Sequence, residues 1–136
     1  MEAAVKGRRD RNLKLLAVTV MKNLTQDDLA EQGVQMDAGE LVVHRASLAE
    51  EAGFDGVIAS GQEAAAIRAA TGKDFLIVTP GIRPAGAEVA DQARVLTPAK
   101  AIAAGATHLV VGRPITQAED PGAAAAAIVT EIAAVG

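Results

Sequence analysis

The sequence predicts an α/β fold in which parallel strands alternate with helices. Short, mostly apolar runs recur along the chain, and each is followed by a segment that carries helix start and stop signals. Nearly continuous apolar strands are typical of a parallel sheet covered by helices. Because no linker or low-complexity tract interrupts the 136 residues, we expect a single domain spanning residues 1–136.

Four segments have the length and the aliphatic, β-branched composition of buried strands. They are residues 13–20 (LKLLAVTV), 56–59 (GVIA), 75–79 (FLIVT) and 108–111 (HLVV). A basic segment, residues 1–11, precedes the first strand and is expected to form a short N-terminal helix.

Two helices are expected after the first strand. Thr25 begins a short acidic helix in which Asp28 is placed for a capping box, and Gly33 ends it. Asp37 begins a longer helix, and Gly53 ends that one at the position where glycine commonly follows a helix.

Three further helices follow the later strands. They are expected at residues 60–72, 97–105 and 120–135. Ser60 and Glu63 are placed to cap the first of them, and proline stands at the first helical position of the other two. A long loop rich in glycine, proline and charge, residues 80–95, separates the third strand from its helix. Loops of this length often act as lids.

The chain therefore contains four βα units, which is half of the eight that close a TIM (β/α)₈ barrel. A half-barrel leaves two open sheet edges and an uncovered inner face. We expect these surfaces to be covered by self-association, or by a complementary N-terminal half. Rearrangement into an open sheet is the alternative.

Composition argues against several classes of function. Phe54 and Phe75 are the only aromatic residues, so the chain offers no stacking platform for single-stranded nucleic acid. A net charge of −4 also argues against a nucleic-acid partner. No apolar run reaches the length of a membrane helix, and the charged start of the chain does not resemble a signal peptide. We expect a cytoplasmic protein without a membrane partner.

Metal and thiol chemistry find no support in the sequence. The chain has no cysteine, so it can form neither a disulfide nor a thiolate site. His44 is expected on a helix surface, and His108 at the N-terminal end of a strand, away from the expected site. Neither histidine has a companion at the spacing of metal ligands, and we expect no metal site.

The loops after the strand ends are the expected functional loops, because ligands bind at the carboxyl ends of parallel strands. Gly112 and Arg113 follow the fourth strand, and Arg83 follows the third between Gly81 and Gly86. Arginine can grip a phosphate with two parallel hydrogen bonds, and glycine lets a ligand approach the backbone. These residues are a candidate anion cradle. The alternative is that each arginine is only a surface charge.

Three other polar residues lie in the loops that follow the strands. Lys22 follows the first strand, where it could bind an anion or act as a base, or could be a surface lysine. Gln92 lies on the long loop and is more simply a solvated side chain. Ser60 is expected to be a helix cap and not a nucleophile.

Five segments together resemble a known family over essentially the whole chain. They are residues 15–20 (LLAVTV), 55–60 (DGVIAS), 78–86 (VTPGIRPAG), 91–106 (DQARVLTPAKAIAAGA) and 110–121 (VVGRPITQAEDP). In this combination they resemble the C-terminal half of bacterial-type orotidine 5′-phosphate decarboxylase.

The resemblance implies a (β/α)₈ barrel that converts orotidine 5′-monophosphate to UMP and CO₂ without a cofactor, in pyrimidine biosynthesis. It implies that Gly112 and Arg113 bind the 5′-phosphate, that Gln92 bridges phosphate and pyrimidine, and that Arg83 contacts the nucleotide. Lys22 departs from the family, which usually has threonine or serine there, in contact with the base.

The family's catalytic lysine–aspartate network, in a D-x-K-x-x-D motif, is absent from the sequence. By resemblance that motif belongs to the other half of the barrel. We therefore expect no catalytic residue here, and a phosphate-binding half that is inactive alone. The alternatives are a non-catalytic half-barrel that dimerises and binds phosphate or nucleotide, and a fragment that reports only on folding and assembly.

Overall fold

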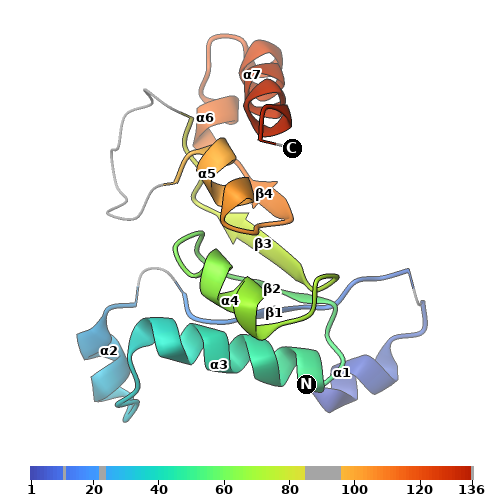
Figure 1. Ribbon diagram of the computed structural model, residues 1–136, viewed down its shortest axis with the longest axis vertical. Coiled ribbons are helices and arrows are strands. Elements are labelled where there is room, and N and C mark those ends of the chain that lie inside the picture. Colours follow the sequence, from blue (N-terminus) through green and yellow to red (C-terminus); the bar gives the residue numbers. More distant parts are fainter. Residues whose placement is uncertain (11, 22–23, 85–95, 136) are drawn as a thin grey trace.

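The fold is a single four-stranded parallel sheet with helices between its strands, as Figure 1 shows. The computed structural model describes residues 1–10, 12–21, 24–84 and 96–135. The strands are β1 (Leu16–Val18), β2 (Gly56–Ile58), β3 (Leu76–Pro80) and β4 (His108–Val110), and they lie side by side in chain order. The predicted half of a (β/α)₈ barrel is confirmed.

Seven helices are described in these parts of the chain. They are α1 (Glu2–Gly7), α2 (Gln26–Glu31), α3 (Ala38–Glu51), α4 (Ala64–Ala70), α5 (Pro98–Ala103), α6 (Arg113–Thr116) and α7 (Pro121–Ala133). All the helices expected from the sequence are present. The one-turn helix α6 was not expected. None of the described helices is long and apolar enough to cross a membrane.

Side-chain caps fix several helix starts where the sequence places them. Thr25 and Asp28 form the predicted reciprocal capping box of α2. Asp120 accepts a hydrogen bond from the Ala123 amide at the start of α7. The predicted Ser60–Glu63 cap of α4 is wrong. A turn comes first, in which the Ser60 hydroxyl accepts from the Gln62 amide at 3.3 Å, and the helix begins only after Glu63.

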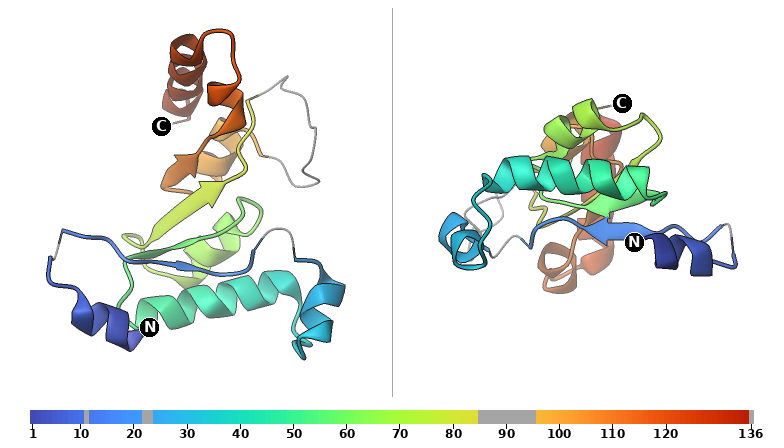
Figure 2. Two further views of the ribbon diagram at one scale, coloured as in Figure 1. Left: turned by 180° about the vertical axis from the view of Figure 1, so that it is seen from behind. Right: turned by 90° about the horizontal axis from the view of Figure 1, so that it is seen from below.

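The main hydrophobic core lies between one face of the sheet and helices α3 and α4. Val57 and Ile77 point into it from neighbouring strands, and both are completely buried. Ala46 of α3 and Ile67 of α4 meet them from the helix side. Figure 2 shows these two helices on the same side of β1 and β2. A smaller cluster of Ile82, Ala101 and Ala106 attaches α5 to the end of the sheet.

The opposite, inner face of the sheet has no helix over it in the described part of the chain. Val18, Ile58 and Val78 form one row across three strands, because the strands pair residue for residue. Val18 on β1 is 59% exposed and Val110 on β4 is 50% exposed. The expected uncovered face and two outer strands, β1 and β4, are therefore present.

The N-terminal end of the sheet is held by polar contacts around Asp55. Its carboxylate accepts hydrogen bonds from the Leu15 amide at 2.8 Å and from Lys14 at 3.2 Å. The Arg8 guanidinium, just after α1, forms an ion pair with the same carboxylate. These contacts attach the N-terminal segment and β1 to the start of β2.

At the same end of the sheet, the guanidinium of Arg68 on α4 bonds to three backbone carbonyls. Its nitrogens donate to Gly72 at 2.6 Å, Phe75 at 2.7 Å and Gly105 at 3.3 Å. Arg68 thus joins α4 to the start of β3 and to the end of α5. In a parallel α/β fold, residues at this end serve stability, while ligands bind at the other.

Candidate functional site

The pairing of β3 with β4 sets the geometry of the candidate site. Pro80 and Val110 are register partners at the carboxyl ends of the two strands. Arg83 and Arg113 each follow their paired residue by three positions. Gly81 turns the chain away from β3 with a φ of 81°, a conformation that other residues rarely adopt. Both arginines are therefore at the same edge of the sheet, as the sequence predicted.

Gly112 and Arg113 form the start of α6 and not an open loop. The carbonyl of Gly112 accepts hydrogen bonds from the Ile115 amide at 2.9 Å and the Thr116 amide at 3.1 Å. A Cβ atom added to Gly112 would meet no heavy atom within 4 Å, so the space beside this glycine is open. The Arg113 side chain is exposed. In (β/α) barrels, a short extra helix after a late strand commonly accompanies a phosphate site.

Arg83 is anchored at the base of the long loop. Its amide donates to the Leu96 carbonyl at 3.1 Å, and Ile82 and Leu96 form an isolated parallel bridge. The guanidinium donates back to the Ile82 carbonyl at 2.9 Å and is half-buried. Residues 82–83 and 96 therefore hold the two ends of this loop together. Gln92 lies within it and is outside the described residues, as is Lys22.

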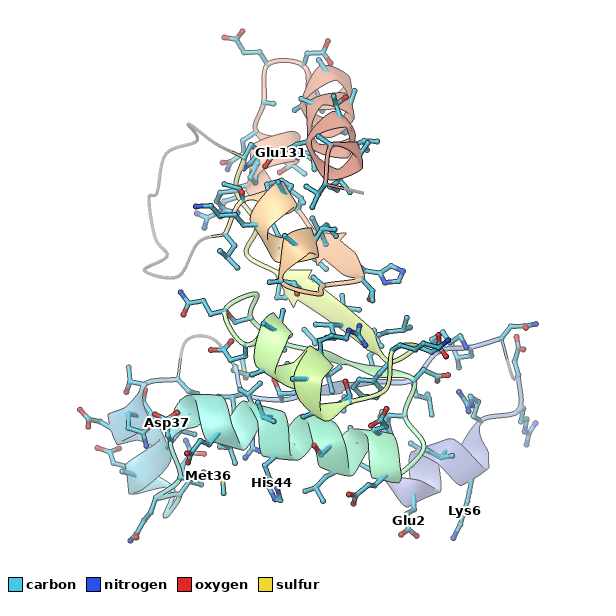
Figure 3. The ribbon with its side chains drawn as sticks, viewed as in Figure 1. Glu2, Lys6, Met36, Asp37, His44 and Glu131 are labelled. Carbon is cyan, nitrogen blue, oxygen red and sulfur yellow. The ribbon has the colours of Figure 1, made fainter. Side chains whose placement is uncertain are left out.

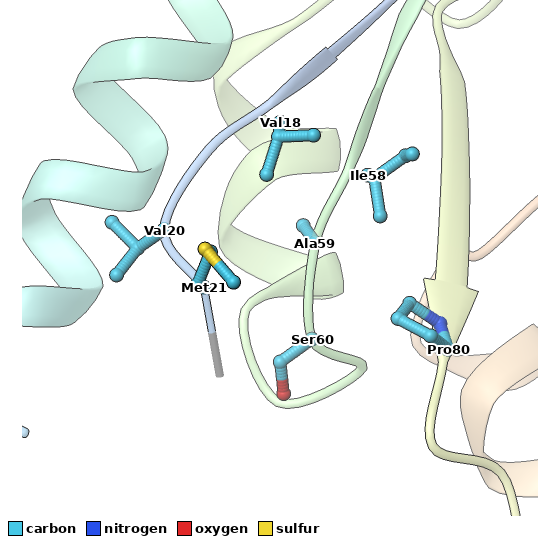
Figure 4. A pocket seen from close by; sticks show the side chains of 7 residues that line it. All are labelled: Val18, Val20, Met21, Ile58, Ala59, Ser60 and Pro80. Atoms are coloured by element: carbon cyan, nitrogen blue, oxygen red, sulfur yellow. The ribbon is translucent and has the colours of Figure 1, made fainter. Parts of the chain in front are cut away.

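A pocket of about 340 Å³ lies at the same edge, where β1, β2 and β3 end (Figure 4). It is lined by Val18, Val20, Met21, Ile58, Ala59, Ser60 and Pro80. Its volume is within the range of small-molecule sites. The lining is apolar except for the Ser60 hydroxyl, so the pocket can take an apolar group beside a single side-chain hydroxyl.

Sequence reasoning missed this pocket, although it placed each strand correctly. Residues of three strands and of the loops after them line the pocket. No local sequence pattern shows which apolar residues remain uncovered by another helix or strand. The signal that could have indicated the pocket is the count of four βα units. A half-barrel leaves inward-facing residues such as Val18 and Ile58 without a packing partner on the inner face.

The end of β1 is held in place by a residue from α3. Arg45 donates from its guanidinium to the Thr19 carbonyl at 2.6 Å. Thr19 is buried, and its hydroxyl donates to the Ile58 carbonyl at 3.1 Å. These two bonds fix the backbone immediately before Val20 and Met21, which line the pocket.

Within the described part of the chain, neither histidine is paired with Ser60. His44 is exposed on the outer side of α3 (Figure 3), and His108 lies at the N-terminal end of β4, next to Thr107. His44 lines a hollow with Gln62 and Glu63, but Ser60 is not part of that lining. Among the described residues, no group of three or more His, Cys, Asp or Glu could hold a metal ion.

Comparison with known proteins identifies what this arrangement is similar to. Residues 1–128 match the model of the orotidine 5′-phosphate decarboxylase / HUMPS family. The orotidine 5′-phosphate decarboxylase of Afipia carboxidovorans is 54% identical over 133 residues, which are 98% of this chain and 57% of that protein. The enzyme of the same name from Methylobacterium sp. strain 4-46 is 56% identical over 136 residues, or 58% of its length.

Solved structures agree with the sequence matches. The crystal structure of orotidine 5′-phosphate decarboxylase from Lactobacillus acidophilus superposes with a TM-score of 0.76 at 43% identity, covering 88% of this chain and 49% of that one. An uncharacterized conserved protein from Geobacillus kaustophilus gives the same TM-score at 32% identity, covering 96% and 57%. The chain thus spans about half the length of these relatives, from 49% to 58%.

Proposed function

Because this chain belongs to the orotidine 5′-phosphate decarboxylase / HUMPS family, we propose that it is the phosphate-binding half of an orotidine 5′-monophosphate decarboxylase. The complete enzyme would convert orotidine 5′-monophosphate to UMP and CO₂ in pyrimidine biosynthesis. The observation that carries the proposal is the Pro80–Val110 pairing, because it puts Arg83 and Gly112–Arg113 at one edge of the sheet.

The proposed roles of the site residues come from the family resemblance and agree with the chemistry of their side chains. Arg113 is exposed beside the open space at Gly112, where its planar guanidinium can form two parallel hydrogen bonds to the 5′-phosphate. Arg83, fixed at the base of the loop, contacts the nucleotide from the neighbouring strand end. Gln92 bridges phosphate and pyrimidine from the loop.

The apolar pocket supports a nucleotide over inorganic phosphate. Pro80 lines the pocket and is paired with Val110, which precedes the phosphate residues by two positions. A pyrimidine ring in this pocket would therefore lie on the same edge of the sheet as its own phosphate. Lys22 stands where the family usually has the serine or threonine that contacts the nucleobase. It would offer the nucleobase a positive charge in place of a hydroxyl.

The chemical step requires residues that the sequence does not contain. The D-x-K-x-x-D motif, whose lysine and aspartates perform the reaction in the family, is missing from residues 1–136. We therefore propose that the chain alone binds nucleotide without turning it over, and needs no cofactor. A non-catalytic, nucleotide-binding half-barrel is the second candidate, and the missing motif is the observation that favours it.

Two measurements test these proposals. UMP binding is measured by calorimetry for the parent, for Arg113→Ala and for Arg9→Ala, a control that removes an exposed arginine at the opposite end of the sheet. Loss of a charge-assisted phosphate contact should cost about 1.5–3 kcal/mol, which weakens binding roughly 10- to 150-fold. Arg9→Ala should bind like the parent. Equal binding by the parent and Arg113→Ala would refute the phosphate assignment.

The second measurement separates the two candidates. Decarboxylation of orotidine 5′-monophosphate is followed for the chain alone and for the chain mixed with the N-terminal half of a relative. Turnover only in the mixture supports the enzyme half. UMP binding without turnover in either sample supports the non-catalytic half-barrel. Turnover by the chain alone would contradict the assignment of the catalytic residues to the other half.

A further inference from the structure

The loop that follows β1 carries two residues of the pocket. Val20 and Met21 line it, and they come directly after Thr19. Thr19 is bonded firmly to β2, because its amide and its hydroxyl both donate to the Ile58 carbonyl, at 3.3 Å and 3.1 Å. Among the described residues, neither Val20 nor Met21 forms a hydrogen bond with the sheet. The sheet therefore fixes the chain as far as Thr19 and no further.

Arg45 of α3 holds the start of this loop from the other side. Its guanidinium donates to the Thr19 carbonyl at 2.6 Å. No backbone amide in the described ranges donates to that carbonyl. A hydrogen bond from a charged donor is shorter and stronger than one between neutral groups. Because the Thr19 carbonyl belongs to the peptide that joins Thr19 to Val20, the bond fixes the direction in which the loop leaves the sheet.

The core beneath the loop is closed by apolar residues of the same helix. Val20 packs against the main core, to which Val42 of α3 belongs, and its side chain points toward α3 in Figure 4. Arg45 follows Val42 by three positions, which places the two side chains beside each other on the helix surface. Arg45 itself is largely exposed. Its bond to the Thr19 carbonyl therefore acts on the loop and adds little to the packing of the core.

We propose that Arg45 is a positioning residue for the nucleobase. By holding the Thr19 carbonyl, it keeps Val20 and Met21 where they form one wall of the pocket. Arg45 is not among the residues that line the pocket, so it acts through the backbone and not by touching the ligand. The inference rests on the proposed function, in which the pyrimidine ring occupies this pocket and Arg113 binds the phosphate. Loss of Arg45 should therefore impair recognition of the base and not of the phosphate.

A ligand with a nucleobase and a ligand without one separate these two effects. UMP and ribose 5-phosphate are titrated by calorimetry into the parent and Arg45→Ala, each alone and mixed with the N-terminal half of a relative. Arg45→Ala should weaken UMP binding about 3- to 10-fold, which corresponds to the loss of one ordinary hydrogen bond. It should bind ribose 5-phosphate like the parent. Arg113→Ala should weaken the binding of both ligands.

Two further variants distinguish positioning from a general loss of structure. Arg45→Lys keeps a charged donor at this position and should recover most of the UMP affinity. His44→Ala introduces the same alanine at the neighbouring exposed position of α3 and should bind both ligands like the parent. Circular dichroism shows whether each variant keeps the fold. Hydrogen exchange at residues 20 and 21 should be faster in Arg45→Ala than in the parent, and unchanged in His44→Ala.

The possible results overturn the two proposals separately. Arg45→Ala that weakens both ligands equally, or neither, would refute the positioning role, while weaker binding of both ligands by Arg113→Ala would leave the phosphate site standing. Arg45→Lys that binds UMP no more tightly than Arg45→Ala would also refute the positioning role. A parent that binds neither ligand, alone or in the mixture, would overturn the proposed function and the role of Arg45 with it.

Discussion

Pro80 and Val110 are register partners on β3 and β4, and Arg83 and Arg113 follow them at equal distance along the chain. If the two arginines bind the same phosphate, their contributions to binding must be coupled. We expect Arg83→Ala and Arg113→Ala each to weaken UMP binding, and the double variant to lose less than the sum by about 0.5 kcal/mol or more.

Calorimetric titration of the parent, both single variants and the double variant gives this coupling directly. The pair Arg9→Ala and Arg113→Ala serves as control, because Arg9 lies at the opposite end of the sheet. The losses of binding free energy of these two variants should add in the double variant. Additive losses for Arg83 and Arg113 would mean that they do not share a ligand group.

The elements with local signals were predictable from sequence. The capping box of Thr25 and Asp28 and the proline starts of α5 and α7 lie where the sequence puts them, because these interactions join residues three or four positions apart. The prediction of a Ser60–Glu63 helix cap was wrong because a tight turn can use the same residues. The local sequence does not distinguish such a turn from a helix cap.

The candidate site was predictable only in part. The strand ends located Arg83 and Gly112–Arg113, since the carboxyl ends of neighbouring parallel strands lie at the same edge of a sheet. The single turn of α6 is shorter than the window over which helical periodicity can be detected. The pocket depends on which elements fail to cover β1, β2 and β3, and that is a long-range property. Lys22 and Gln92 remain predictions.

Two buried threonines, Thr19 just after β1 and Thr79 in β3, should respond oppositely to the same substitution. The Thr79 side chain is fully buried, and its hydroxyl has no hydrogen-bond partner among the described residues. Thr19 is equally buried, but its hydroxyl donates to the Ile58 carbonyl. Valine has nearly the same shape as threonine and lacks the hydroxyl. Thr79→Val should therefore raise the free energy of unfolding by about 1 kcal/mol, and Thr19→Val should lower it by about 1 kcal/mol.

Urea denaturation of both threonine variants beside the parent measures these differences. Since the two substitutions are chemically identical, each serves as the control for the other. Destabilisation by Thr79→Val comparable to that by Thr19→Val would show that the Thr79 hydroxyl has a partner.

Gly56 is expected to be intolerant of any side chain. It pairs with Leu16 on one side and Leu76 on the other, and an added Cβ would overlap the backbone oxygen and the Cβ of Leu76. Gly56→Ala would have to move β2 away from β3, at a cost of about 1–3 kcal/mol. Gly7→Ala is the control, because a Cβ there meets nothing within 4 Å. Thermal melts should show a lower midpoint for Gly56→Ala alone. Equal midpoints would mean that the strands separate without cost.

Asp55 should make the stability of the fold depend on pH in acid. The hydrogen bond from the Leu15 amide holds the pKa of its carboxyl below the usual range, and Lys14 and Arg8 act in the same direction against the opposing effect of burial. Because the pKa is lower in the folded chain than in the unfolded one, Asp55 stabilises the fold above about pH 4. This contribution is lost as the pH falls through the folded-state pKa.

We expect Asp55→Asn to lower the free energy of unfolding at pH 7 by roughly 1–2 kcal/mol, because the ion pairs with Arg8 and Lys14 are lost. The loss is modest because solvent partly screens both ion pairs. The variant should also lose less stability than the parent between about pH 4 and pH 2. Asp74→Asn, which changes an exposed carboxylate before β3, is the control and should follow the parent. Urea denaturation at several pH values measures both effects. Parallel curves for Asp55→Asn and the parent in acid would show that Asp55 titrates alike in the folded and unfolded chains.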